Sequence, residues 1–212
     1  MWMVVGLGNP GAKYARNRHN VGFRAVELLA SRHGVGELKS GGKLGGHVAT
    51  GVIVTPRGRQ KVVLLEPMEF MNLSGFAVQR AGAFYGVDLE HTLVVHDEID
   101  LDVGLVRVKT GGGHGGHNGL RSIIEQCGGN GFARVRIGVG KPGPKPGTAD
   151  GGLPKGKAGD KDVAGWVLAD FPSAQAAMVD ALLARAADAV EAIVGLGVAA
   201  AMNEFNGKPA VA

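Results

Sequence analysis

Short apolar segments alternate along the chain with longer amphipathic ones. The short segments are rich in β-branched residues and are bounded by glycine, proline or polar residues, which is typical of strands. They are residues 2–8, 46–55, 61–66, 92–97, 105–109 and 133–139. Between them, apolar residues recur at helical spacing in 20–33, 74–86 and 118–127. Asn20, Ser74 and Asn118 begin these segments, so we expect them to be the N-caps of three helices.

The C-terminal part of the chain has a different pattern. Residues 173–204 are rich in alanine and carry their larger apolar residues on one face, which predicts one long helix packed on the sheet. The segment 141–162 is dominated by Gly, Pro, Lys and Asp, so we expect a flexible insertion and not a second domain. Together these elements predict an α/β fold: a single-domain sandwich over 1–212, with a mixed, largely parallel twisted sheet flanked by helices.

The composition excludes several classes of protein. Of the 212 residues, 45% are hydrophobic and 20% charged, as in ordinary globular proteins. Cys127 is the only cysteine, which rules out an intramolecular disulfide and favours a reducing compartment. No uninterrupted apolar stretch reaches the ~20 residues that a bilayer requires. We therefore expect a cytoplasmic protein without membrane association. Nothing in the sequence indicates an oligomer, so we expect a monomer. The net charge of +4 is compatible with a polyanionic partner but does not identify one.

The first glycine-rich motif, Gly6–Gly11, follows a predicted strand and has the spacing of a dinucleotide-binding turn. Pro10 lacks an N–H donor, however, and no acidic residue ends a second strand ~20 residues later. A tight turn that presents the side chain of Asn9 explains the same glycines. We therefore expect no cofactor.

His19 and Asp97 form the candidate catalytic pair. His19 lies at the start of a predicted helix, and His96 and Asp97 end a central strand, at the edge where α/β proteins place their sites. An Asp that accepts a hydrogen bond from Nδ1–H of a histidine leaves Nε2 free as a general base. Since no Gly-x-Ser-x-Gly turn occurs in the sequence and Cys127 has no obvious activating partner, we expect water to be the nucleophile.

A second glycine-rich run, residues 111–119, contains His114 and His117 and opens a predicted helix. Its backbone N–H groups suit a phosphate or a carbonyl oxygen. The two histidines also suggest a metal ligand set, but they lack the helical framework of zinc signatures. We expect structural or orienting roles for both and no metal.

Several motifs of the sequence occur in one order. They are GLGNPG with Tyr14, RHNVGF (18–23), EPMEFMNLSG (66–75), HDEID (96–100), KTGGGHGGHNGLRSI (109–123), FARVRIGVGKP (132–142) and DVAGWVLADF (162–171). In this set and order the chain resembles bacterial-type peptidyl-tRNA hydrolase. The resemblance implies hydrolysis of the ester that links a peptide to the 3′ end of tRNA. This reaction recycles tRNA from prematurely released peptidyl-tRNA, a form of ribosome rescue in translation.

The resemblance also implies roles for individual residues. His19 matches the catalytic base, Asp97 the carboxylate that supports it, and Asn9 the residue that checks for a blocked α-amine. The positions that contact the terminal region of the substrate are Tyr14, Phe70, Asn72 and Asn118. Lys109 and Arg136 match basic residues that bind tRNA phosphates. The partner is thus peptidyl-tRNA, bound by its acceptor end and phosphate backbone, with an amide of Asn72 or Asn118 or a glycine-loop N–H stabilising the oxyanion.

Three questions stay open at the level of sequence. The insertion at 141–162 is longer than the family's usual connection, and its lysines make it either a flexible contact with the tRNA backbone or a neutral spacer. A metal-assisted hydrolase remains an alternative, with ligands drawn from His19, His96, Asp97, His114 and His117. A non-catalytic RNA-binding module would share the basic charge and the glycine loops.

Overall fold

The structure, a computed structural model, describes residues 1–142 and 160–209. One seven-stranded sheet runs through it, in the order β2-β3-β4-β1-β5-β7-β6. The strands are β1 (Trp2–Gly6), β2 (Lys39–Ser40), β3 (Gly46–Thr55), β4 (Gly58–Pro67), β5 (Thr92–Glu98), β6 (Val106–Thr110) and β7 (Ala133–Gly138).

The centre of the sheet is parallel. β1 pairs with β4 and β5, and β5 pairs with β7, all in parallel, whereas β2, β3 and β6 join through antiparallel pairings. Parallel strands are buried on both faces, which is why the central strands are continuous apolar runs without alternation. The predicted mixed sheet is confirmed, with its parallel pairings confined to β4-β1-β5-β7.

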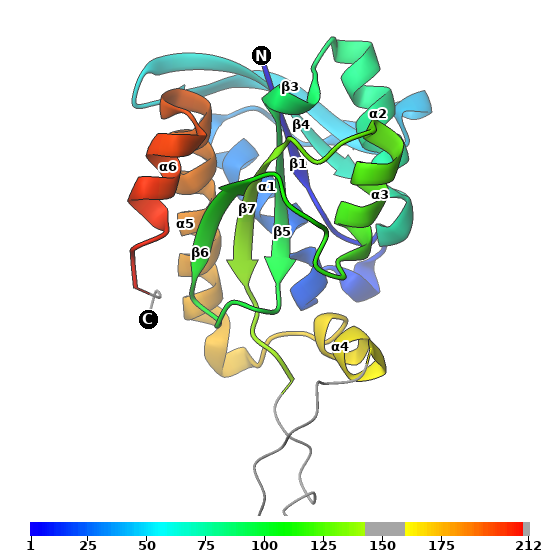
Figure 1. The fold of residues 1–212 in the computed structure, drawn as a ribbon, viewed down its shortest axis with the longest axis vertical. Coiled ribbons are helices and arrows are strands. Elements are labelled where there is room, and N and C mark those ends of the chain that lie inside the picture. The colour runs from blue at the N-terminus through cyan, green and yellow to red at the C-terminus, as the bar shows by residue number, and fades with distance from the viewer. Residues whose placement is uncertain (143–159, 210–212) are drawn as a thin grey trace, which may run out of the picture.

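Helices cover both faces of this sheet (Figure 1). They are α1 (Val21–His33), α2 (Ser74–Tyr85), α3 (Asn118–Cys127), α5 (Ala176–Leu196) and α6 (Val198–Phe205), whereas α4 (Asp160–Val167) lies beyond the carboxyl ends of β5 and β7. Val4 of β1 belongs to the apolar core beneath α1, α5 and α6, and its neighbour Val5 belongs to the core beneath α2 and α3. The predicted α/β layers are therefore confirmed. No helix of the described residues has the length and apolarity needed to cross a membrane.

Two predictions about the C-terminal part need correction. The single helix expected over 173–204 is two helices, α5 and α6, because Gly197 between them has φ 89° and ψ 162°. Only glycine adopts this backbone conformation readily, so the α-helix ends there. The expected flexible insertion at 141–162 is partly helical, since α4 begins at Asp160, and residues 143–159 lie outside the described part.

The predicted helix caps also differ from the observed ones. Asn20 stands at the N-cap position of α1, but its side chain makes no capping bond. Ser74 lies inside α2, and its hydroxyl donates to the carbonyl of Met71. At α3 the cap is His117 and not Asn118, because His117 has an extended backbone and its Nδ1 accepts from backbone amides.

Glycines bring α1 unusually close to the sheet. A Cβ on Gly22 of α1 would lie 2.4 Å from the carbonyl oxygen of Val95 and 2.5 Å from the backbone nitrogen of Leu7. Real Cβ atoms do not approach backbone this closely. The absence of a side chain at Gly22 therefore lets the start of α1 rest against the carboxyl ends of β1 and β5.

Replacing Gly22 tests this contact. We expect Gly22→Ala to lower the free energy of unfolding by about 1–3 kcal/mol, because the methyl group must push α1 off the sheet. The matched control is Gly131→Ala, where a Cβ meets nothing within 4 Å. Urea denaturation followed by circular dichroism measures both variants, and equal midpoints would show that the close approach is not a constraint.

Candidate active site

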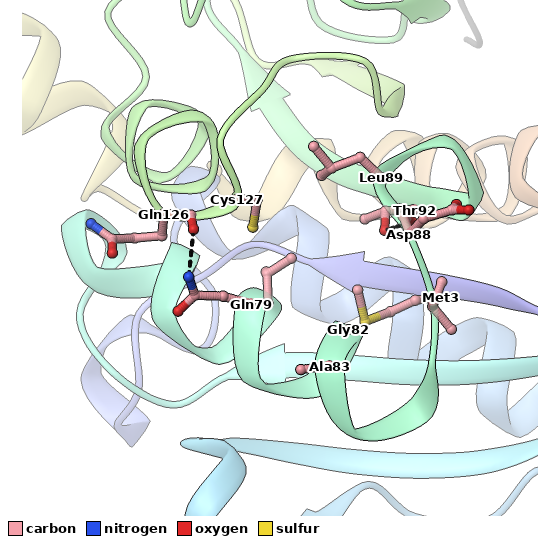
Figure 2. A pocket seen from close by; sticks show the side chains of 11 residues that line it. Met3, Gln79, Gly82, Ala83, Asp88, Leu89, Thr92, Gln126 and Cys127 are labelled. Atoms are coloured by element: carbon pink, nitrogen blue, oxygen red, sulfur yellow. Dashed lines mark hydrogen bonds between the residues drawn. The ribbon is translucent and has the colours of Figure 1, made fainter.

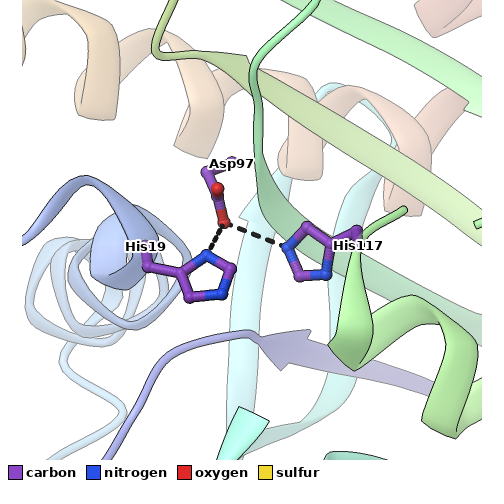
Figure 3. Close-up of side chains that lie close together, drawn as sticks. All are labelled: His19, Asp97 and His117. Atoms are coloured by element: carbon purple, nitrogen blue, oxygen red, sulfur yellow. Dashed lines mark hydrogen bonds and ion pairs between the residues drawn. The ribbon is translucent and has the colours of Figure 1, made fainter. Parts of the chain in front are cut away.

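His19 and Asp97 lie in direct contact where the central strands end. His19 belongs to a 3-10 helix, η2 (Arg18–Asn20), that leads into α1, and Asp97 lies near the end of β5. The Nδ1 atom of His19 is 2.7 Å from Oδ1 of Asp97 (Figure 3). The side chain of Asp97 is 2% exposed and that of His19 is 13% exposed. The pair is therefore largely shielded from solvent, and Nε2 of His19 takes no part in the contact with Asp97.

His117 binds the same carboxylate oxygen. Its Nε2 is 3.0 Å from Oδ1 of Asp97 (Figure 3). Its Nδ1 accepts from the backbone N–H groups of Gly119 and Leu120, at 3.1 and 3.4 Å. A backbone N–H can only donate, so Nδ1 carries no proton and Nε2 must be the donor to Asp97. One carboxylate therefore receives two imidazole N–H groups.

These contacts set the protonation of the site. Burial opposes the ionised form of Asp97, but His19 and His117 outweigh it and hold the pKa of the carboxyl well below its usual range. For His19, burial disfavours the charged form, yet the charge and hydrogen bond of Asp97 raise its pKa above 6.5. His19 is therefore a stronger base than a free imidazole, with a carboxylate that stays ionised beside it.

The same three side chains are the described group best placed to hold a metal ion, since their ligand atoms lie within 4.8 Å of one another. The hydrogen bonds of His117 oppose that use. For Nε2 to bind a cation, the ring proton would have to move to Nδ1, where it would face the amide protons of Gly119 and Leu120. Metal binding by this cluster would thus remove the cap of α3.

His96, the other histidine of the strand, is a core residue. It is 1% exposed, and its Nδ1 lies 2.7 Å from the carbonyl oxygen of Asp97. Burial, with the nearby His117, lowers the pKa of His96 to about 3, so the ring is neutral at physiological pH. Its ring centroid is 5.1 Å from that of His117, against which it packs edge to face. His96 therefore packs against the ring of His117 that bonds Asp97.

Asn9 is fixed by two independent sets of hydrogen bonds. Its side-chain oxygen accepts from the backbone nitrogen of Met71 at 2.9 Å. Its backbone N–H and carbonyl bond the side-chain amide of Asn20, at 3.0 and 2.9 Å. Because Oδ1 is already occupied, Asn9 presents its NH₂ group as the free polar end. Asn20, expected to be only a cap, is the residue that positions Asn9.

One cleft of about 740 Å³ is lined by Asn9, His19, Asp97 and His117. Its lining includes every residue predicted to be catalytic or to contact the terminal region of the substrate: Asn9, Tyr14, His19, Phe70, Asn72, Asp97 and Asn118. They come from segments that follow β1 and β4, from β5 itself and from the start of α3. Apolar side chains of α4 complete the lining. The parallel strands explain this convergence, because their carboxyl ends meet at one edge.

The two predicted phosphate-binding residues do not line this cleft. Arg136 donates to Glu98 from Nε and Nη2, at 3.1 and 3.0 Å. Lys109 lies opposite Arg134 in the β6–β7 ladder. Arg134, which the sequence did not single out, is 2% exposed and donates to the carbonyls of Gly112 and Gly113 at 2.6 and 2.7 Å. Lys109 and Arg136 thus form a basic area beside the glycine loop (residues 111–119). The two hydrogen bonds from Arg134 hold the backbone of that loop.

A second cavity, of about 230 Å³, lies at the other edge of the sheet (Figure 2). Met3 and Thr92, which line it, are at the amino ends of β1 and β5. Cys127 also lines it, and burial raises the pKa of that thiol to about 11. The thiol is therefore protonated and unreactive at neutral pH, as the absence of an activating partner predicted.

Comparison with known proteins gives one consistent answer. The family model described as peptidyl-tRNA hydrolase matches residues 3–211. The peptidyl-tRNA hydrolase of Streptomyces avermitilis is 44% identical over 97% of this chain and 93% of its own, and that of Chloroflexus aggregans is 43% identical over 97% and 99%. A crystal structure of peptidyl-tRNA hydrolase from Acinetobacter baumannii matches with a TM-score of 0.82 and 41% identity, over 98% of this chain and 95% of that one. This chain therefore belongs to the peptidyl-tRNA hydrolase family.

Proposed function

We propose that this protein hydrolyses the ester bond between peptide and tRNA in peptidyl-tRNA and so recycles the tRNA. The observation that carries the proposal is the His19–Asp97 contact of 2.7 Å inside the 740 Å³ cleft, in a chain of this family. We expect it to act as a cytoplasmic monomer without a metal or cofactor.

His19 acts as the general base. Its Nδ1–H is directed to Asp97, so Nε2 has the lone pair that removes a proton from water. The resulting hydroxide adds to the ester carbonyl carbon and forms a tetrahedral intermediate. When the bond to the 3′ oxygen of tRNA breaks, that oxygen takes the proton from His19. Asp97 stabilises the transient imidazolium, and His117 holds Asp97 in place.

The amide side chains read the acyl part of the substrate. Asn9 offers an NH₂ group, and Asn118 does the same because its Oδ1 is engaged by Arg121. Such donors suit carbonyl oxygens, including the ester oxygen that becomes negative in the intermediate. A blocked α-amine contributes a carbonyl that accepts from Asn9. A free α-ammonium has only donors, so its contact with Asn9 is unfavourable, which accounts for selection of N-blocked substrates.

Substitution of the catalytic pair tests this mechanism. We expect His19→Ala to reduce turnover of N-acetyl-aminoacyl-tRNA by about 10²–10⁴-fold and Asp97→Ala to reduce it less, since Asp97 acts through His19. Free aminoacyl-tRNA, which lacks the blocking carbonyl, is the control substrate for the wild type. Loss of wild-type activity in EDTA would instead support the metal-assisted alternative, and undiminished turnover by His19→Ala would remove His19 from the reaction.

The pH dependence of kcat/KM reports the same pair. The base must be unprotonated, so kcat/KM should fall as the pH drops through the raised pKa of His19, above 6.5. In Asp97→Asn the negative charge is gone while the burial remains, so the acidic limb should move to lower pH. NMR titration of the His19 ring provides the independent measurement. An unchanged limb in Asp97→Asn would mean that another group controls the rate.

The basic area beside the glycine loop is proposed to bind tRNA phosphates. We expect Lys109→Ala or Arg136→Ala to raise KM, leave kcat unchanged, and reduce the slope of log KM against log salt by about 1 each. Lys39→Ala is the control, because Lys39 is exposed on β2, at the opposite end of the sheet. Slopes equal to that of the wild type would place the phosphates elsewhere.

A further inference from the structure

Arg18, the residue before His19, has an environment that the proposed chemistry does not explain. It is 4% exposed, and arginine side chains are seldom fully buried unless they are paired. Its Nη1 donates to three backbone carbonyls, those of Trp166, Ala169 and Asp170, at 3.3, 3.1 and 3.0 Å. These carbonyls belong to the end of α4 and the residues that follow it. Arg18 therefore closes the C-terminal end of this helix.

Aromatic rings enclose the guanidinium. Its central carbon lies 3.8 Å from the centroid of a Trp166 ring and 5.0 Å from that of Phe171. The indole N–H of Trp166 in turn donates to the carbonyls of Val139 and Gly140, at 3.2 and 2.9 Å. Trp166 thus joins Arg18, on which it stacks, to the residues that follow β7 at the carboxyl edge of the sheet.

The backbone around Arg18 makes further contacts with the same segment. The N–H of Arg18 donates to the carbonyl of Ala169 at 3.1 Å. Asn17 forms an isolated antiparallel bridge with Asp170, and its side-chain amide donates to the Asp170 carboxylate at 2.7 Å. Side-chain and backbone contacts therefore both join η2, which carries His19, to the residues that end α4.

The segment held in this way forms a wall of the catalytic cleft. Of the cleft-lining residues, those contributed by α4 and the residue after it are Val163, Ala164, Val167 and Leu168. They are all aliphatic, whereas Asn9, His19 and Asn118 supply polar groups to the same cleft. The distance between base and wall thus depends on contacts made by the residue next to the base.

From this geometry we infer that Arg18 is a positioning residue for the proposed reaction: it fixes the α4 wall relative to His19, so that the substrate's acyl group is held against the base. The inference rests on the proposed function. A lysine cannot replace Arg18 fully, because an ammonium group lacks the planar surface that stacks on Trp166 and reaches the three carbonyls less well. A wall that is no longer fixed weakens substrate binding and leaves the base intact.

The test compares Arg18→Lys with the wild type in hydrolysis of N-acetyl-aminoacyl-tRNA. We expect KM to rise about tenfold, kcat to stay within about twofold, and the acidic limb of the pH profile to be unchanged. Amide hydrogen exchange should become at least about tenfold faster in 163–170 and remain the same in α5. Arg32→Lys is the matched control, because Arg32 of α1 also bonds a later helix, through Asp188, Glu191 and the carbonyl of Ala184 in α5. It does not line the cleft, so the substitution should leave KM unaltered.

A second pair of variants separates positioning from plain stabilisation. In a Leu168→Ala background, which has already lost part of the wall, Arg18→Lys should raise KM by less than it does in the wild type. Equal increases in both backgrounds would overturn the inference, as would a fall in kcat with a shifted pH limb, which would mean that Arg18 acts on His19 itself.

Trp166→Phe serves if Arg18→Lys does not fold. It removes the bonds to Val139 and Gly140, keeps an aromatic ring under Arg18, and should give the same pattern with a smaller KM increase. An unchanged KM with a folded Trp166→Phe protein would overturn the inference. If the wild type does not hydrolyse the substrate at all, the proposed function fails, and exchange in 163–170 still reports whether Arg18 fixes the wall.

Discussion

The whole site depends on one buried carboxylate. Asp97 is 3% exposed, and burial alone would favour its neutral form. Two imidazole N–H groups, from His19 and His117, stabilise its charge on a single oxygen. Each partner also gains from the contact: His19 becomes a stronger base in a fixed tautomer, and His117 keeps its Nδ1 lone pair for the amides that begin α3. The same tautomer of His117 therefore serves both the charge of Asp97 and the start of α3.

This carboxylate connects two layers of the fold. Asp97 lies on the central strand β5, His19 leads into α1 on one face of the sheet, and His117 caps α3 on the other. The close approach permitted by Gly22 keeps the first of these contacts short. A shift of α1 or α3 would therefore change the hydrogen bonds of Asp97. The packing of the two cores and the geometry of the His19–Asp97 pair thus cannot vary independently.

The sequence predicted those features that depend on local pattern. Buried parallel strands appear as apolar runs, and Asp97 could be placed at the edge because it ends one of them. The cap of α3 could not be chosen in this way, since His117 and Asn118 are adjacent and both can accept a backbone N–H. The break between α5 and α6 at Gly197 could not be predicted either, because the residues around it form an alanine-rich run that favours a continuous helix. The contact of Arg18 with Trp166 joins residues 148 positions apart, and only the folded chain brings them together.

The distribution of charge suits the proposed function, in which one site acts on many peptides that are attached to one kind of nucleic acid. The cleft places the amides of Asn9, Asn72 and Asn118 beside the His19–Asp97 pair, and amides can bond a peptide backbone without selecting side chains. Arg121 lines the cleft and donates to Oδ1 of Asn118, whereas the proposed phosphate-binding residues, Lys109 and Arg136, do not line it. That separation matters because a positive charge near His19 would lower the pKa that Asp97 raises. Glu98, bonded to Arg136 and adjacent to Asp97 in β5, further shields the base from that cation.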